Sequence, residues 1–368
     1  SDVSTIAEDG VRAADGGFVY PGGFGVNSNG SDGFLTSWQF SGTTNILSSL
    51  ESLNTSSDQV TGTIASQLSA TCCSSPSLLY RTLGAGIFGN DLGLYSVFNQ
   101  ATDSSSYGLL NPVAAGVLGA SWLPPYPSTL QISGVAWNQT NDVAAFFGEL
   151  PSAGRGPATW SLFTSNLAAD TFGSLYDINA AVSSETFPEY TAIAENPATN
   201  QAWLTSLDGF SFCGTPTIVD VDLASGNASS FTGVGSGTPE SMTIDPTTNV
   251  AAVTTGCDGG LGIYNLTSRT GANVILPGAQ PGYYLTVDPV RHLFLVAQLN
   301  PPDGLTNANA LSHLLVYDEN GNLIENKNGF QWFTLGIYQG LNGVQIVPAT
   351  RSGLAFGPDQ AQLEPFTY

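Results

Sequence analysis

The chain has 368 residues, the length of two or three average domains or of one large all-β domain. It carries 7 Lys+Arg against 29 Asp+Glu, which gives a net charge of −22, and only 10% of its residues are charged. So few basic groups exclude binding to nucleic acid and to anionic membrane surfaces, because contact with phosphates requires many Lys and Arg side chains. The longest apolar runs reach about half of the roughly 20 residues that a membrane helix needs, so no membrane span is expected.

Three features of the sequence indicate export. The sparse ionisable groups make stability and solubility depend little on pH, which suits an acidic or extracellular medium. The numbering opens with Ser-Asp-Val-Ser and no Met, as removal of a signal peptide would leave it. Four cysteines fit an oxidising compartment. We therefore expect a mature, secreted, extracellular protein.

The first quarter of the chain holds two features of interest. Val3–Ala7 is a short β-compatible stretch that precedes the first predicted strands near Gly17–Tyr20. Cys72 and Cys73 are adjacent, which is compatible with a strained vicinal disulfide ring, with two bonds to other chains, or with two inert thiols. The sequence does not choose among these three arrangements.

Two glycine- or proline-rich segments follow. Gly84–Gly89 matches the dinucleotide motif G-x-G-x-x-G, but turn and strand residues follow it where that motif requires a helix, so we interpret it as a linkage between strands. The segment 112–130 is apolar and rich in proline, and we interpret it as an insertion between the second and third of the repeats described next. Such a segment either forms an interface or covers the edge of the domain.

One segment type recurs from residue 134 onward: an apolar strand, a tight turn, and a second apolar strand. Its clearest turns read Asn/Asp-Pro-x-x-Asn, in which Pro sets one corner and the Asx residues bend or cap the other, so the segments are predicted to be β-hairpins. They return about every 52 residues, at 134–147, 191–204, 241–253, 284–296 and 343–356.

A second strand pair follows each hairpin and indicates the whole architecture. Its strand has an aromatic or branched centre and occurs in seven copies, around Trp38, Tyr95, Phe163, Val219, Tyr264, Tyr317 and Phe366. Four short strands per repeat without helical periodicity are typical of a β-propeller blade. We predict an all-β fold, a single β-propeller domain over residues 1–368 with seven four-stranded blades. A ring of six or eight blades, a pair of β-sandwiches and a β-helix are the alternatives.

The ends of the chain predict how the ring closes. The last repeat stops at its third strand, Leu363–Tyr368, so its fourth strand has to come from elsewhere. The N-terminal stretch Val3–Ala7 is the expected source. It closes the ring within one molecule, or it fills the gap in a neighbouring molecule and thereby builds a polymer.

The hairpins resemble those of the secreted propeller proteins of the YVTN, NHL and gluconolactonase-like groups, whose repeats carry a comparable apolar-Asp-Pro-x-x-Asn-apolar turn. The resemblance covers residues 134–356 well and the first 130 residues poorly. It implies the propeller fold, whereas the function within these groups ranges from lactonases, lyases and redox enzymes to structural and recognition modules.

Acidic residues at the start of two hairpins are the candidate metal ligands. Glu189 and Glu240 each follow a proline that enters an innermost strand. In gluconolactonase-like enzymes, which these repeats resemble, carboxylates and amides at such positions hold a divalent metal. The resemblance thus implies a calcium-type cation between Glu189 and Glu240. The alternative is that both are solvated loop acids, since the sequence shows no third ligand.

The remaining candidate residues point to structure more than to catalysis. Cys213 and Cys257 each follow a strand in neighbouring repeats, so we predict a disulfide between them. His292 lies in a hairpin turn and His313 leads into a strand, which favours structural roles for both, and no catalytic residue set or organic cofactor is expected. Five sequons occur as often as chance predicts and mark candidate glycosylation sites at Asn29, Asn54, Asn138, Asn227 and Asn265.

These observations favour a non-enzymatic, self-associating extracellular propeller, such as a subunit of a fibre or surface layer. Two alternatives remain open at this point. One is a gluconolactonase-like, metal-dependent hydrolase with its cation at the channel mouth. The other is a propeller that binds a carbohydrate or peptide ligand.

Overall fold

We describe the fold from a computed structural model of the chain. The described residues are 19–26, 32–41, 45–54, 59–70, 78–81, 93–99, 104–111, 116–122, 130–138, 143–150, 158–166, 169, 171–209, 211–298, 311–331, 343–357 and 362–368. They are almost entirely β-strands, joined by turns and two short 3-10 helices. Within these residues, no helix is long and apolar enough to cross a bilayer. The all-β prediction is confirmed.

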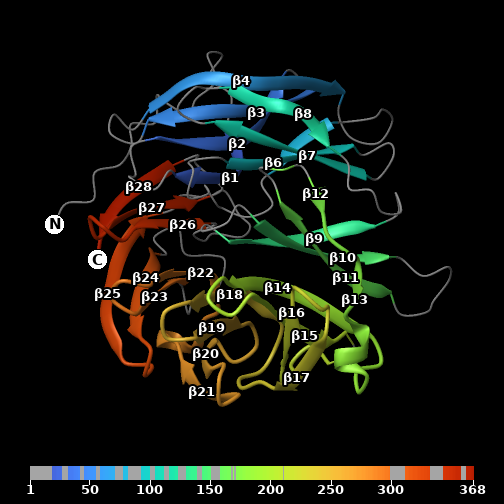
Figure 1. The fold of residues 1–368 in the computed structure, drawn as a ribbon. Coiled ribbons are helices and arrows are strands. Elements are labelled where there is room, and N and C mark those ends of the chain that lie inside the picture. Colours follow the sequence, from blue (N-terminus) through green and yellow to red (C-terminus); the bar gives the residue numbers. More distant parts are fainter. Residues whose placement is uncertain are drawn as a thin grey trace. The chain divides into compact units, whose positions relative to one another are not determined.

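The chain divides into two compact units, which we describe separately. Unit 1 comprises residues 1–129, 332–334 and 345–367, and unit 2 comprises residues 130–331, 335–344 and Tyr368. All sheets in both units are antiparallel and are built from strands that follow one another along the chain (Figure 1).

Unit 1 contains two four-stranded sheets and most of a three-stranded one. The first sheet runs β1-β2-β3-β4 and the second runs β5-β6-β7-β8, while the third runs β26-β27-β28. The strands are β1 (Val19–Val26), β2 (Asp32–Ser41), β3 (Asn45–Asn54), β4 (Gln59–Ala70), β5 (Leu78–Arg81), β6 (Gly93–Asn99), β7 (Ser104–Asn111), β8 (Gly116–Trp122), β26 (Gly343–Val347), β27 (Ser352–Gly357) and β28 (Gln362–Thr367).

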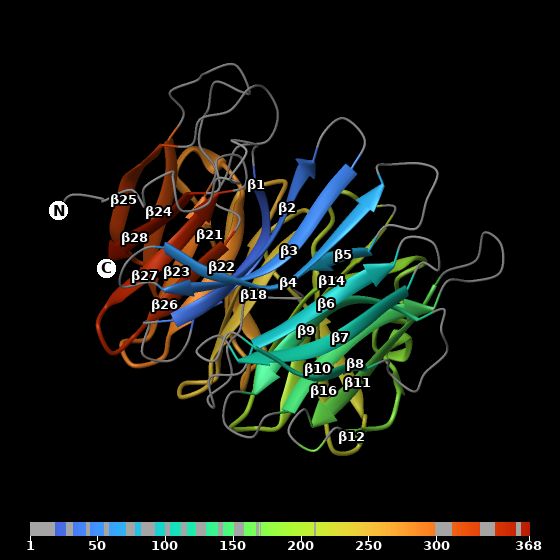
Figure 2. The ribbon, with the colours of Figure 1, turned by 90° about the horizontal axis from the view of Figure 1, so that it is seen from above.

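Unit 2 contains four sheets, one after another in the chain. Their strands are β9 (Gln131–Asn138), β10 (Val143–Leu150), β11 (Thr159–Asn166), β12 (Thr171–Phe172), β13 (Tyr176–Asp177), β14 (Pro188–Asn196), β15 (Gln201–Asp208), β16 (Thr217–Asp222), β17 (Ala228–Thr232), β18 (Pro239–Asp245), β19 (Val250–Thr255), β20 (Gly260–Asn265), β21 (Thr270–Ile275), β22 (Gly282–Asp288), β23 (Leu293–Gln298), β24 (Leu311–Asp318) and β25 (Leu323–Gln331). The 3-10 helices are η2 (Asn179–Val182) and η3 (Pro277–Ala279). The first strands of successive sheets, β9, β14, β18 and β22, contact one another in that order (Figure 2).

The core of unit 2 consists of layers between neighbouring sheets. One layer joins the sheets of β10 and β15 around Phe147 and Leu204, and a second joins those of β15 and β19 around Trp203 and Val253. A third joins the sheets of β19 and β23, and Phe294 lies fully buried in it. Each middle strand is therefore buried on both faces, which explains why these strands read as continuous apolar runs. Face-to-face stacking of four-stranded sheets is the packing of a propeller.

The Asx-Pro-x-x-Asn turns form as the sequence predicts. The first residue of the turn is buried, and its side-chain oxygen accepts the backbone N–H two residues later, at 2.8 Å from Thr247 to Asp245 and at 2.9 Å from Val290 to Asp288. The last residue of the turn takes the left-handed conformation, with φ of 58° at Asn249. Asparagine adopts this conformation more readily than most residues, which explains its recurrence there.

The segment 112–130 differs from its prediction as an insertion. Residues Gly116–Trp122 form β8, which pairs with β7 and completes the sheet β5–β8. The four prolines of the segment, Pro112, Pro124, Pro125 and Pro127, lie outside the described residues. The predicted closing strand Val3–Ala7 and the motif Gly84–Gly89 lie outside the described residues.

Candidate functional site

The turns of unit 2 gather at two opposite ends of its sheets. Because each sheet is antiparallel, the turns between first and second strands lie at one end, and the turns between second and third strands lie at the other. The disulfide and the two candidate metal-binding glutamates lie toward the second of these ends. A separate cluster of ionisable residues lies at the first end.

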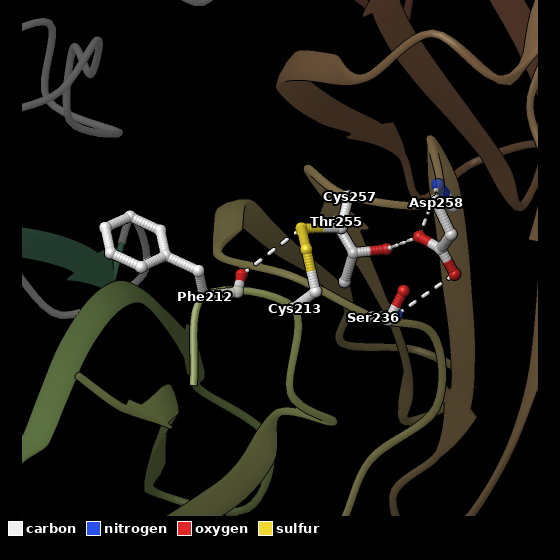
Figure 3. The surroundings of a disulfide bond; sticks show 7 residues. Phe212, Cys213, Ser236, Thr255, Cys257 and Asp258 are labelled. Atoms are coloured by element: carbon white, nitrogen blue, oxygen red, sulfur yellow. Dashed lines mark hydrogen bonds between the residues drawn. A yellow bond between two sulfur atoms is a disulfide. The ribbon is translucent and has the colours of Figure 1, made fainter. Parts of the chain in front are cut away.

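The disulfide links two neighbouring sheets through their turns (Figure 3). Cys213 lies between β15 and β16, Cys257 lies between β19 and β20, and their Cα atoms are 5.6 Å apart. Both cysteines are exposed. The bond therefore joins two surface turns that have no continuous hydrogen-bonded sheet between them. Cys72 and Cys73 lie outside the described residues, so the three arrangements proposed for them stay open.

Polar contacts hold the backbone around this disulfide. The carboxylate of Asp258 accepts the Ser236 N–H at 3.0 Å and the Thr255 hydroxyl at 2.7 Å (Figure 3). Gly237 has φ of 102°, and a Cβ there would lie 2.3 Å from the backbone nitrogen of Cys257, so only glycine fits. These contacts connect the segments around Cys257. Phe212, next to Cys213, is the most exposed large apolar side chain among the described residues, with 81% of its surface exposed.

Glu189 and Glu240 lie on the first strands β14 and β18, and both residues are exposed, although the carboxyl group of Glu240 is partly surrounded by protein. Each carboxylate lies over its own sheet: a Cβ on Gly209 would be 2.6 Å from Glu189 Oε1, and one on Gly256 would be 3.1 Å from Glu240 Oε1. Within the described part of the chain, the group of ionisable residues close enough to share a metal ion includes neither glutamate. Their role as ligands stays a prediction.

Glu240 nevertheless has an unusual environment. Partial burial raises the pKa of its carboxyl group, and its charge adds to the effect of burial in raising the pKa of Tyr284 on the adjacent strand β22. The folded protein thus binds the proton of Glu240 more tightly than the unfolded chain does. Its contribution to stability is complete below the ordinary glutamate pKa and is lost as pH rises through the folded-state value.

We expect Glu240→Gln to be more stable than the wild type at pH 7, because the neutral amide removes the cost of a partly buried charge. The difference should disappear near pH 3, where Glu240 is protonated in both states. Chemical unfolding of the two proteins at both pH values measures this. An equal difference at both pH values would contradict the assignment. If millimolar Ca²⁺ stabilises the wild type but not the variant, Glu240 is a metal ligand after all.

At the opposite end, three side chains from three turns meet, and we name Asp245, His292 and Glu319 the Asp–His–Glu cluster. Their ligand atoms lie within 4.8 Å of one another. Asp245 ends β18, His292 lies between β22 and β23, and Glu319 lies between β24 and β25. Asp245 is fully buried, and its Oδ2 lies 2.8 Å from His292 Nδ1, whereas the imidazole side chain is 47% exposed.

Two threonines complete the surroundings of the Asp–His–Glu cluster. The Thr247 hydroxyl donates to Asp245 Oδ1 at 2.6 Å and lies 3.4 Å from His292 Nδ1, and the Thr248 hydroxyl donates to Glu319. The hydrogen bond to Asp245 raises the pKa of His292 above its ordinary value. Burial raises the pKa of Glu319, and the charge of Asp245 adds to this effect. The two carboxylates therefore face one imidazole and also repel each other.

The remaining candidate residues are scattered over the sheets. His313 is the third residue of β24, and its Nδ1 lies 2.8 Å from Asn326 Oδ1, which fits the structural role expected for it. Of the sequons, Asn227 and Asn265 are exposed at turns, Asn54 is half-buried in β3, and Asn138 ends β9. Asn29 lies outside the described residues.

The sequence gives no direct indication of the Asp–His–Glu cluster. Asp245 and His292 are 47 residues apart in the chain and lie on two different sheets, so no local motif connects them. A signal was present: aligned repeat against repeat, the turn that ends in Asn at Asn200 and Asn249 ends in His at His292.

Comparison with known proteins supports the fold. The chain is similar to the solved structure of the Dos1 propeller, at 10% identity over 95% of this chain and 92% of that one, with a TM-score of 0.55. It is also similar to the β-propeller domain of Cps50 (Swd1) from Myceliophteria thermophila, at 10% identity over 96% of this chain and 99% of that one, with a TM-score of 0.56.

No protein-family model matches the sequence. No curated protein matches it either. At such low identity, the likeness to the two propellers shows the fold alone.

Proposed function

We propose that the protein is a non-enzymatic, extracellular propeller of seven blades that assembles into a fibre or layer by strand exchange. The observation that carries this proposal is the sheet β26–β28, which has three strands where each of the other described sheets has at least four. In the proposed assembly, the missing strand is the stretch Val3–Ala7 of a neighbouring molecule.

The chemistry of β28 supports an added strand. β28 is the last strand of its sheet and pairs with β27 from Gln362 to Thr367. The edge strand of a sheet presents backbone N–H and C=O groups to which a further strand can be added. Pro365 lacks an N–H, so β28 has no backbone donor at this position. The stretch Val3–Ala7 is short, and a short added strand is compatible with an edge strand that contains a proline.

The disulfide supports the extracellular location. Disulfides between surface turns persist in oxidising compartments and are rare in reducing ones. The exposed Phe212 next to Cys213 adds an apolar contact point, and exposed aromatic side chains are common on assembly surfaces.

The test is the mass and shape of native, unheated protein, measured by light scattering and electron microscopy of one sample. We expect polymers for the wild type and monomers for a variant that lacks residues 1–8. A synthetic peptide of residues 1–10, added to the truncated variant, should bind once per molecule and increase its thermal stability. A peptide of the same composition in scrambled order is the control.

Two outcomes would overturn the proposal. Wild-type protein that is monomeric at 38 kDa would exclude assembly. If the truncated monomer is then less stable than the wild type, the N-terminal segment closes the ring within one molecule. Polymers that persist after removal of residues 1–8 exclude strand exchange by this segment.

A further inference from the structure

The Asp–His–Glu cluster occupies positions that the preceding pair of sheets fills with neutral residues. Asp245 corresponds to Asn196, since each is the last residue of the first strand in its sheet. His292 corresponds to Asn249, since each closes the next turn in the left-handed conformation, with φ of 57° and 58°. In the neutral pair, Asn196 Nδ2 donates to Asn249 Oδ1 at 2.7 Å. This contact between sheets therefore forms without any ionisable group.

The third member departs from the repeat in the same way. Glu319 is the residue directly after the third strand of its sheet, and the corresponding residues of the two preceding sheets are Leu223 and Leu266. Both leucines are buried, with 8% and 3% of their surface exposed. An acidic side chain at a position that otherwise buries leucine brings no gain in packing. Its place beside Asp245 and His292 calls for another explanation.

We propose that the Asp–His–Glu cluster binds a divalent late transition metal ion of the Zn²⁺ class. Two carboxylate oxygens and one imidazole nitrogen are a three-ligand donor set for such an ion, and a water molecule supplies the fourth ligand. Each of the three neutral counterparts, Asn196, Asn249 and Leu266, lacks a strong ligand for it. At all three positions, the residue of the Asp–His–Glu cluster is therefore a stronger metal ligand than its counterpart.

The geometry suits an ion that enters from the surface. Asp245 supplies a buried and already oriented carboxylate, because its Oδ1 accepts the hydroxyl and the N–H of Thr247. His292 is half-exposed, so the ion and its water have access to the site. The ligand atoms lie within 4.8 Å of one another, so small movements of the side chains would bring all three into contact with an ion between them.

A bound cation would also remove the electrostatic cost of the cluster. Asp245 and Glu319 bring two like charges together, and an ion between them replaces repulsion with attraction to both. The imidazole ligand sets the class of ion, because Ca²⁺ and Mg²⁺ take oxygen ligands, whereas Zn²⁺ and its neighbours accept imidazole. The site is distinct from the calcium-type site predicted at Glu189 and Glu240.

The experiment titrates the metal-free, full-length protein with ZnCl₂ after alkylation of any free thiols, and follows it by calorimetry. The matched variant is the triple substitution Asp245→Asn, His292→Asn and Glu319→Leu, which installs the residues of the preceding sheets. We expect one ion per chain for the wild type, an affinity at least roughly 100-fold lower for the triple variant, and no displacement by millimolar Ca²⁺. Unchanged Zn²⁺ affinity in the triple variant would overturn the proposal.

The two histidines of the chain allow a direct readout on the site. In a ¹H–¹³C spectrum of the imidazole groups, Zn²⁺ should shift the His292 resonance and leave that of His313 unchanged. The single variant His292→Asn lacks this resonance and so assigns it, and in calorimetry it should bind Zn²⁺ more weakly than the wild type. Asn249 adopts the same backbone conformation, so the substitution is compatible with the turn. His313→Asn is the control and should bind as the wild type does. A shift of the His313 resonance alone would show that the ion binds elsewhere and would overturn the proposal.

Discussion

Replacing Cys213 and Cys257 together by serine is expected to lower the free energy of unfolding by about 4 kcal/mol. The disulfide closes a loop with a sequence separation of 44 residues, and the loss of loop entropy in the unfolded chain scales with the logarithm of that length. Both cysteines are exposed in turns, so serine leaves no cavity and the effect is that of the cross-link itself. Denaturant unfolding of the variant and the wild type under non-reducing conditions measures the difference.

Reduction of the wild type provides the control for this prediction. A reducing agent should destabilise the wild type by a similar amount and have little effect on the double variant. Any further loss in the double variant upon reduction then reports a bond made by Cys72 or Cys73. A double variant as stable as the oxidised wild type would show that the turns are held by their hydrogen bonds at Asp258 alone.

Replacement of Trp203 by alanine is expected to cost roughly 3–5 kcal/mol of unfolding free energy, because it opens a large cavity in a packed layer. Trp203 is 2% exposed and packs between the sheet of β15 and that of β19. Its ring lies 6.4 Å from that of Phe231, which in turn lies 6.1 Å from that of Tyr264. The measurement is chemical unfolding followed by far-ultraviolet circular dichroism, since the substitution removes a fluorophore.

Trp203→Phe separates ring packing from the indole N–H. The buried Trp203 Nε1 finds no hydrogen-bond acceptor among the residues described in the structure. Phenylalanine removes this unsatisfied donor and keeps most of the ring, so we expect a cost of about 1 kcal/mol or less. A cost equal to that of alanine would show instead that a phenyl ring cannot replace the packing of the indole, since the loss of one hydrogen bond accounts for only about 1 kcal/mol.

The hairpins and their turns were predictable because their information is local. Proline and Asx residues bend the chain through contacts within a few positions, as the bond from Thr247 to Asp245 shows. The strand β8 is not evident from the sequence, because Gly116–Trp122 lies between prolines and local sequence does not reveal its pairing partner. Pairing with β7 decides its state.

The Asp–His–Glu cluster illustrates what local sequence cannot express. The sequence favours a structural turn role for His292, and its backbone has the left-handed conformation of that turn. Its chemical environment depends on Asp245, which belongs to the neighbouring sheet. Only the stacking of one sheet on the next brings the two side chains to 2.8 Å.

By itself, the sequence specifies the class of the fold, the recurrence of the hairpins and the residues that bend them, because apolar strand runs and turn chemistry act over short distances. The tertiary structure decides which turns of different sheets meet. Contacts between Asp245 and His292, or between Cys213 and Cys257, depend on the distance and angle at which whole sheets pack. Buried side chains such as Trp203 and Phe294 set that packing, and their combined effect cannot be read from any one repeat.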